Sequence, residues 1–195
     1  MLRPLLSLLL GFTLLLGVAV PLGMTFVAGA VMPGQAGGSL IRRDGQVVGS
    51  ALIGQNFSDD RFFQGRPSAT SAAPYDATSS AASQLGPTSA ALLTAVTERV
   101  AGGRDVPADA ATASGSGLDP HISPENARAQ VPRVATARSL PPARVLALVE
   151  QAVEGRELGL FGEPRVNVLR LNLALEVQSQ AVAQGTPGGA APVPR

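Results

Sequence analysis

The sequence predicts an α+β protein in which a single N-terminal transmembrane helix is followed by one small soluble mixed α/β domain. Residues 4–41 carry no charge, and their apolar core from 5 to about 27 spans roughly 34 Å as a helix, against about 30 Å of bilayer hydrocarbon. The following roughly 150 residues mix helical periodicity with strand-like alternation. That length suffices for one hydrophobic core and hardly for two.

The first element is a membrane anchor, predicted over residues 1–32. A cleaved secretory signal is the alternative, because Ala28-Gly29-Ala30 resembles a small-residue cleavage site. The apolar run is longer than a signal peptide needs and has only Arg3 before it, which favours a retained anchor. Arg42 and Arg43 lie well past the span, so the positive-inside rule keeps the N-terminus cytoplasmic and places the domain outside.

Small residues within the anchor indicate a packing face. Ala19 and Gly23 are four residues apart and therefore lie on one side of the helix, where a neighbouring helix could approach closely. This spacing leads us to expect that the anchor packs beside partner subunits.

The soluble domain is predicted over 39–177, after a Gly-rich linker at 33–38. It begins with a β-hairpin over 39–50, because the Asp44-Gly45 dipeptide suits the two positive-φ positions of a type I′ turn. Residues 54–86 are rich in Ser, Ala, Pro and Gly, which predicts a loop. Its length means that it is either disordered or a functional surface.

Three helices and one strand are expected in the rest of the domain. Helices are predicted from the cap at Thr88 or Ser89 to the Gly102-Gly103 stop, from Ser123 with a kink or break at Pro132, and over 141–154. Alternating leucines predict a strand over 164–177. The tail at 178–195 offers nothing to pack and is predicted to be disordered.

The third helix should pack through one apolar face. Its expected buried residues are Val145, Leu146, Val149 and Val153, which recur at helical spacing. The predicted strand has one buried face formed by its leucines, with burial on both faces or a bulge near its start.

Composition excludes several classes of chemistry. The chain has no cysteine, so it can form neither disulfides nor thiolate metal sites. It also has no lysine, because all fifteen basic residues are arginine, and this excludes a P-loop and Schiff-base catalysis. The net charge of +1 argues against a nucleic-acid partner.

The segment 112–121 gathers the residue types that a catalytic site would need. It contains Ser114, Ser116, Asp119 and His121, the only histidine in the chain. A hydrolase elbow would need Gly-x-Ser-x-Gly, but Ser114 occupies the first glycine position. One histidine among scattered carboxylates also lacks metal-ligand spacing. We therefore expect a tight turn at 114–117 and neither a catalytic residue nor a metal.

Arginines near this turn are the other polar candidates. Arg66 and Arg133 could clamp a phosphate or carboxylate, although arginines more often form structural ion pairs. Asp119 and Arg133 border turns and helix ends, where charged side chains face a partner or each other.

Six blocks, in order along the chain, resemble the C-subunit family of the Kdp potassium-transporting ATPase. They are GSALIGQ at 49–55, FQGRPSA at 63–69, LGPT at 85–88, TASGSGLDPHIS at 112–123, QVPRVA at 130–135 and GEPRVNVL at 162–169. The resemblance covers the chain from the anchor to Leu175. It departs from the family at Ala81, Gln84 and Ser89, where glycine, asparagine and asparagine are expected, and at the Ala110-Ala111 pair.

The resemblance implies an accessory subunit of a bacterial inner-membrane complex that imports potassium at the expense of ATP. Its partners would be a potassium-channel-like subunit, a P-type ATPase subunit, a small membrane subunit and the bilayer. The C subunit is required for assembly and is described as a catalytic chaperone that raises the ATPase subunit's affinity for ATP. The chain itself has no phosphorylation motif and no potassium-filter segment.

Cytoplasmic ATP and an extracytoplasmic domain imply an allosteric effect. We expect the long polar loop and the turn at 114–121 to dock on the mouth of the channel-like subunit. The alternative is direct ATP contact through Gln55, Arg66 and the 114–117 turn, which needs the opposite topology. A third alternative is an isolated extracytoplasmic hydrolase. The candidate docking or nucleotide-coupling residues are Gln55, Arg66, Ser114, Ser116, Asp119, His121 and Arg133.

Overall fold

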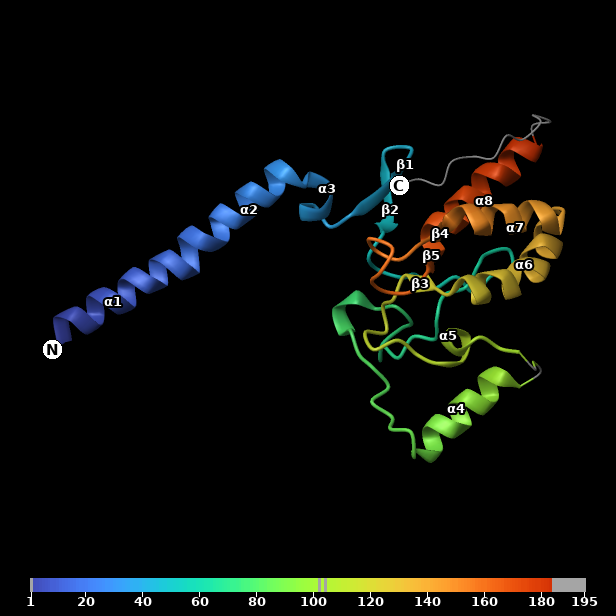
Figure 1. The fold of residues 1–195 in the computed structure, drawn as a ribbon, viewed down its shortest axis with the longest axis horizontal. Helices are drawn as coiled ribbons and strands as arrows, with labels where there is room; N and C mark the ends of the chain where they lie inside the picture. The colour runs from blue at the N-terminus through green and yellow to red at the C-terminus, as the bar shows by residue number, and fades with distance from the viewer. Residues whose placement is uncertain (1, 102, 104, 184–195) are drawn as a thin grey trace. The chain divides into compact units, whose positions relative to one another are not determined.

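The computed structural model describes residues 2–101, 103 and 105–183 (Figure 1). The described chain divides into two compact units, one ending at Ser50 and the other starting at Ala51. Helices and small antiparallel sheets make up these units, which confirms the predicted α+β class.

The first unit begins with one long apolar helix. It consists of α1 (Leu2–Leu14), a π-helical turn (Leu15–Ala19) and α2 (Val20–Val31), with a mean hydropathy of 2.4 in its most apolar window. The π-helical turn precedes Pro21, whose ring would otherwise crowd the carbonyl one turn earlier. Among the described residues, no other helix is long and apolar enough to cross a membrane, as expected of a single-pass anchor.

A short helix and a hairpin follow the long helix. Residues predicted as a linker include one helical turn, α3 (Pro33–Ala36). Strands β1 (Leu40–Arg43) and β2 (Gln46–Ser50) then pair antiparallel, with a bulge between Ile41 and Arg42. Asp44 and Gly45 have φ angles of 51° and 80°, which confirms the predicted hairpin turn with two positive-φ positions.

The second unit is built around a three-stranded antiparallel sheet of order β3-β5-β4. The strands are short: β3 (His121–Ile122), β4 (Val153–Glu154) and β5 (Arg165–Asn167). Helices α6 (Pro124–Arg138), α7 (Pro142–Ala152) and α8 (Val168–Ala183) all contact β5. The core lies between these helices and the sheet. It comprises Phe63, Ile122, Ala127, Val131, Val134, Ala135, Leu140, Val145, Leu148, Val149, Ala152, Val166, Val168, Leu171 and Leu175.

Helices α6 and α7 match the predicted segments, with two corrections. The break expected at Pro132 is absent, because α6 continues to Arg138 and Pro132 lies on its exposed side, where the orphaned carbonyl can meet water. Leu146 was expected in the core but is exposed, and Leu148 is buried in its place. Val145 and Val149 are fully buried as predicted, whereas Val153 lies at the edge of the core in β4.

The strand predicted over 164–177 is wrong. Only Arg165–Asn167 form a strand, and α8 then runs from Val168 to Ala183. Asn167 begins this helix by accepting a hydrogen bond from the backbone N–H of Arg170 on its Oδ1 at 3.1 Å. The tail predicted from 178 also starts too early, because α8 includes the first six of its residues and Gln178 is buried. Residues 184–195 lie outside the described chain.

Between the hairpin and α6, the chain is mostly loop, as predicted for 54–86. That loop contains one 3₁₀ turn (Ala77–Ser79) and is followed by α4 (Ala90–Val100) and α5 (Ala108–Ala111). Ser89 caps α4 as expected, since its hydroxyl accepts the N–H of Leu92 at 3.4 Å. Of the predicted Gly102-Gly103 stop, Gly102 lies outside the described residues.

Candidate functional site

The turn predicted at 114–117 is present and rests on the polar loop. Ser114 accepts the N–H of Gly117 on its hydroxyl at 3.0 Å, and Gly117 has a φ of 69°. A side chain at Gly117 would come within 2.7 Å of the Ala81 carbonyl. Ser116 accepts hydrogen bonds on its carbonyl from the N–H of Ala81 at 3.0 Å and the hydroxyl of Ser80 at 2.9 Å. The two segments predicted to form one docking surface therefore contact each other.

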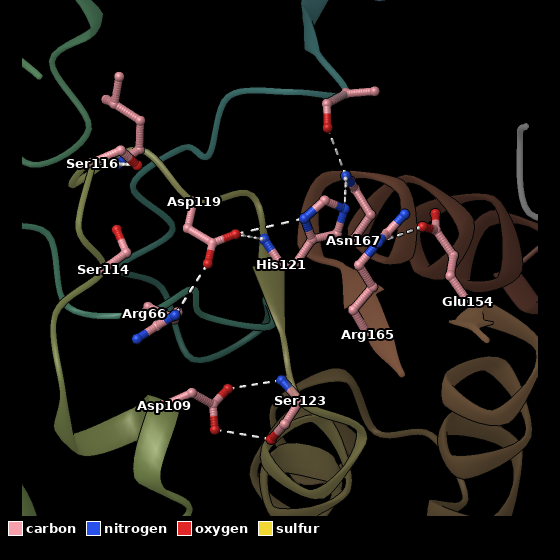
Figure 2. Close-up of polar contacts among 12 residues, drawn as sticks. Arg66, Asp109, Ser114, Ser116, Asp119, His121, Ser123, Glu154, Arg165 and Asn167 are labelled. Atoms are coloured by element: carbon pink, nitrogen blue, oxygen red, sulfur yellow. Dashed lines mark hydrogen bonds and ion pairs between the residues drawn. The ribbon is translucent and has the colours of Figure 1, made fainter. Parts of the chain in front are cut away.

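Asp119 connects this turn to Arg66 and His121 (Figure 2). Arg66 donates from Nη1 to Oδ2 at 3.1 Å, while the other carboxylate oxygen accepts the backbone N–H of His121 at 3.0 Å and faces its Nδ1 at 3.5 Å. The side chains of Arg66, Asp119 and His121 are only 24–28% exposed. The structure thus brings together three of the predicted site residues, as a partly buried ionic cluster.

The electrostatics of this cluster favour a charged Asp119. Burial alone would raise the pKa of Asp119, but the hydrogen bonds from His121 and the neighbouring Arg66 guanidinium together outweigh burial and lower this pKa below its ordinary value. The carboxylate is therefore held ionised as a fixed acceptor, which suits a positioning role.

Asn167 joins the far side of His121 to the start of the domain. Its Nδ2 lies 3.5 Å from His121 Nε2 and donates to the carbonyl of Ala51 at 2.8 Å (Figure 2). Because this residue is nearly fully buried and also caps α8, it fixes three segments at one point. We did not predict it as a site residue, because the sequence analysis placed it in a strand and no local signal marked the start of α8 there.

A second carboxylate, Asp109, ties α5 to the start of α6. It accepts the Ser123 N–H at 2.7 Å, the Ser123 hydroxyl at 2.8 Å and the Asn126 amide at 3.0 Å. Ser123 in turn caps α6 by accepting the N–H of Asn126 at 3.0 Å. This network fixes the end of the 112–123 segment. No local pattern predicts this network, because Asp109 lies fourteen residues from Ser123.

A cleft of about 580 Å³ lies beside the ionic cluster. Its lining includes Arg66 and Arg133 as well as Tyr75, whose hydroxyl donates to the Arg66 carbonyl at 2.6 Å. A Cβ at Gly54 would collide with the Tyr75 ring and a Cβ at Gly65 with its hydroxyl, so both glycines are needed to seat this side chain. Burial, together with the charge of Asp119, raises the pKa of Tyr75 to about 12, which keeps its hydroxyl protonated as a donor.

Arg133 does not pair with Asp119. Its guanidinium donates to the carbonyls of Asp60 at 2.8 Å and Phe62 at 3.1 Å and to Gln130 Oε1 at 2.7 Å. Of the two alternatives for these residues, mutual pairing is therefore absent, and Arg133 instead holds the loop on α6.

The serines do not complete a hydrolase triad in the described chain. The hydroxyl of Ser114 accepts from Gly117 and that of Ser116 accepts from Leu118, while the ring of His121 faces Asp119 and Asn167. The N–H groups of Gly117 and Leu118 are thus already bonded within the turn, so they are not free to cradle a phosphate. No group of three or more acidic or histidine side chains among the described residues could hold a metal.

The remaining candidates lie elsewhere. Gln55 is half-buried and is not among the residues lining the cleft. In the first unit, Ala19 and Gly23 line one shallow apolar groove of about 500 Å³ along α2. A Cβ at Gly23 would meet no described atom within 4 Å, so the packing of this chain alone does not require glycine there.

Comparison with known proteins gives consistent matches over nearly the whole chain. A family model described as KdpC, K+-transporting ATPase, c chain, matches residues 2–177. The potassium-transporting ATPase KdpC subunit of Methylobacterium nodulans is 57% identical over 192 residues, which cover 90% of this chain and 96% of the relative. The corresponding subunit of Methylorubrum extorquens is 54% identical over 195 residues, with 89% and 95% covered. That of Sorangium cellulosum is 57% identical over 183 residues, with 90% and 96% covered.

Proposed function

The chain belongs to the KdpC family, the c chain of the K+-transporting ATPase, and from this premise we propose that it supports assembly and raises the ATP affinity of the P-type ATPase subunit from the extracytoplasmic side. It is a non-catalytic subunit of the potassium uptake complex. The observation that carries the proposal is the extent of the family match, which includes both the apolar helix and the domain core. An effect across the bilayer must be a coupling free energy between sites.

This proposal predicts how the complex responds to ATP. When the complex is reconstituted without this chain, we expect the ATP concentration for half-maximal potassium-stimulated hydrolysis to rise, by a factor in the roughly 5–150-fold range of typical allosteric coupling. Adding the chain back should restore it. Unchanged ATP dependence without the chain would refute the chaperone role.

The orientation of the domain rests on charge. Arg3, in the first turn of the helix, is its only charged side chain, while Arg42 and Arg43 lie beyond its end. We propose an inner-membrane protein with its N-terminus in the cytoplasm and its domain outside. A reporter fused to the C-terminus should be active only when exported; activity in the cytoplasm would reverse the topology.

We further propose that the turn at 114–117 and the loop on which it rests form the docking surface for the channel-like subunit. Gly115 is exposed at the tip of this turn, and a Cβ there would meet no described atom within 4 Å. Gly115→Trp should therefore fold normally but block docking and raise the ATP requirement of the complex. Ala147→Trp, on the exposed side of α7, is the matched control and should have no effect.

The anchor helix offers a second contact with the partner subunits. The groove at Ala19 and Gly23 is open in this chain, and small residues allow close approach of another helix. Replacing both residues with Leu should reduce recovery of the intact complex without changing membrane insertion. Normal recovery would mean that the helix only tethers the domain.

The cleft favours a second candidate function, direct ATP binding. Its volume falls in the usual range of ligand pockets, and two arginines and a tyrosine line it. Both guanidiniums already have partners, however, and the 114–117 turn does not line the cleft. Calorimetric titration of the full chain with ATP distinguishes the two functions: Arg66-dependent binding would favour direct contact, whereas no heat supports the allosteric proposal.

A further inference from the structure

The connection between β4 and β5 ends in an unusually apolar tip, Glu157–Phe161. Leu158 is 93% exposed, Leu160 72% and Phe161 61%. Contiguous exposed apolar side chains rimmed by polar residues can mark interaction sites. The tip lies far in sequence from the turn at 114–117, and the proposed docking surface does not include it.

The backbone of the tip is held by hydrogen bonds and is strained. Glu157 and Phe161 exchange two backbone hydrogen bonds of 2.9 and 3.0 Å, and Leu160 donates to the Glu157 carbonyl at 3.1 Å. Leu158 and Gly159 have φ angles of 53° and 73°, the pattern of a type I′ turn.

The hairpin of the first unit shows what this turn normally requires. There the same two positions are Asp44 and Gly45, with φ angles of 51° and 80°. A leucine in the left-handed region is disfavoured, and a leucine with almost its whole side chain in water adds a solvation cost. Turn geometry therefore does not explain Leu158, and a binding role does.

The residues that flank the tip, 154–157 and 162–165, form its stem. Ion pairs stabilise this stem and leave it without net charge. Arg156 contacts Glu163 at 3.0 Å, and Arg165 bridges Glu154 at 3.1 Å and Glu157 at 3.0 Å. With Arg170 also bound to Glu154, three arginines and three glutamates balance. The base of the tip thus has no unpaired guanidinium to attract lipid phosphate, and it presents three apolar side chains on a preorganised support.

We propose that the tip inserts Leu158, Leu160 and Phe161 into an uncharged apolar pocket on another protein subunit of the membrane complex. This rests on the proposed assembly function. Three side chains fall far short of the roughly 20–30 residues that each partner contributes to a stable interface, which argues against self-association through the tip alone. The anchor helix holds the chain beside its partners at high effective concentration. A contact as small as these three side chains is therefore sufficient. The neutral stem favours a protein pocket over an anionic bilayer surface.

Two matched triple variants of the full chain test the role of the tip. The polar variant carries Leu158→Asn, Leu160→Gln and Phe161→Gln; the apolar variant carries Leu158→Met, Leu160→Met and Phe161→Leu. Recovery with the affinity-tagged ATPase subunit should fall at least tenfold for the polar variant and stay within twofold for the apolar one. Wild-type recovery of the polar variant would overturn the proposal.

Site-specific photocrosslinking identifies the occupant without altering the turn. A photoreactive residue at position 160 of an otherwise wild-type chain in native membranes should give an adduct with a subunit of the complex. Adducts with lipid only, or with a second copy of this chain, would overturn the proposal. The two proposals can be tested separately. If omitting the wild-type chain leaves assembly and ATP affinity unchanged, the proposed function is wrong. If omitting the chain has an effect but the tip variants are recovered like wild type, only this inference is wrong.

Discussion

Helices α4 and α8 have similar amounts of apolar sequence but opposite roles in the domain. In α4 no residue is buried, and Leu93 is 69% exposed. In α8, Val168, Leu171 and Leu175 belong to the core. Figure 1 shows α4 standing apart from the layer that α6, α7 and α8 form. An apolar face is therefore enough to make a helix, but its stabilising effect depends on what covers it.

The two helices also differ in their polar contacts. Asn172 on α8 is buried; it donates to the Phe63 carbonyl at 2.9 Å and accepts the Phe63 N–H at 2.8 Å. This amide holds the long loop against the core, so that the ring of Phe63 is completely buried. The core of the second unit thus depends on α8 both for apolar packing and for the one loop segment that it holds.

The largest effect that we predict compares the two helices directly. Leu171→Ala removes a fully buried side chain from α8 and should lower the free energy of unfolding by about 2–5 kcal/mol. Leu93→Ala on α4 should change it by less than about 0.5 kcal/mol. Urea unfolding of the full chain in detergent, followed by circular dichroism, measures both. Similar losses for the two variants would show that α4 is packed as firmly as α8.

The same comparison explains which parts of the fold could be predicted. For α4, α6 and α7, the caps and apolar spacing are local signals, and the helices follow them. For α8, the alternation of Leu169, Leu171, Leu173 and Leu175 resembles a strand. The helical pattern is hidden because two residues on the buried face of the helix, Asn172 and Gln178, are polar. The partner that allows Asn172 to be buried is Phe63, 109 residues away, which no local pattern contains.

The candidate site was predictable only where local residue types indicate it, and not where it depends on contacts between distant segments. Arg66, Asp119 and His121 were named from residue type, and the structure brings them together. Tyr75 and Asn167 were missed because their roles depend on close approach to distant backbone, at Arg66 and Ala51. The function of these residues in the complex stays a prediction.

The second prediction uses pH to test the segment before β3, the strand that pairs with β5 at the start of α8. Asp119 lies beside β3, and its pKa is lowered in the folded protein. Its charge therefore stabilises the fold above the ordinary pKa of 3.8, and this contribution is lost as the pH falls through the lower folded value. Asp119→Asn should lower the free energy of unfolding by about 1–2 kcal/mol at pH 7. The difference in this free energy between variant and wild type should become smaller below pH 3.8. A difference that does not change with pH in acid unfolding would show that the charge contributes nothing.

The smallest global effect is expected for the cap of α4. Ser89→Ala removes the hydroxyl that accepts the Leu92 N–H, and a cap of this kind typically stabilises its helix by about 1 kcal/mol. Because α4 has no buried residue, we expect it to open locally while the core stays folded. The variant should therefore leave the urea midpoint of the full chain unchanged but speed amide hydrogen exchange in residues 92–100 by about fivefold. The matched change at the cap of α6, Ser123→Ala, also breaks the contact with Asp109 and should lower the midpoint. Equal shifts of the midpoint for the two caps would mean that α4 unfolds together with the core, and the contrast between α4 and the α6–α8 layer would be wrong.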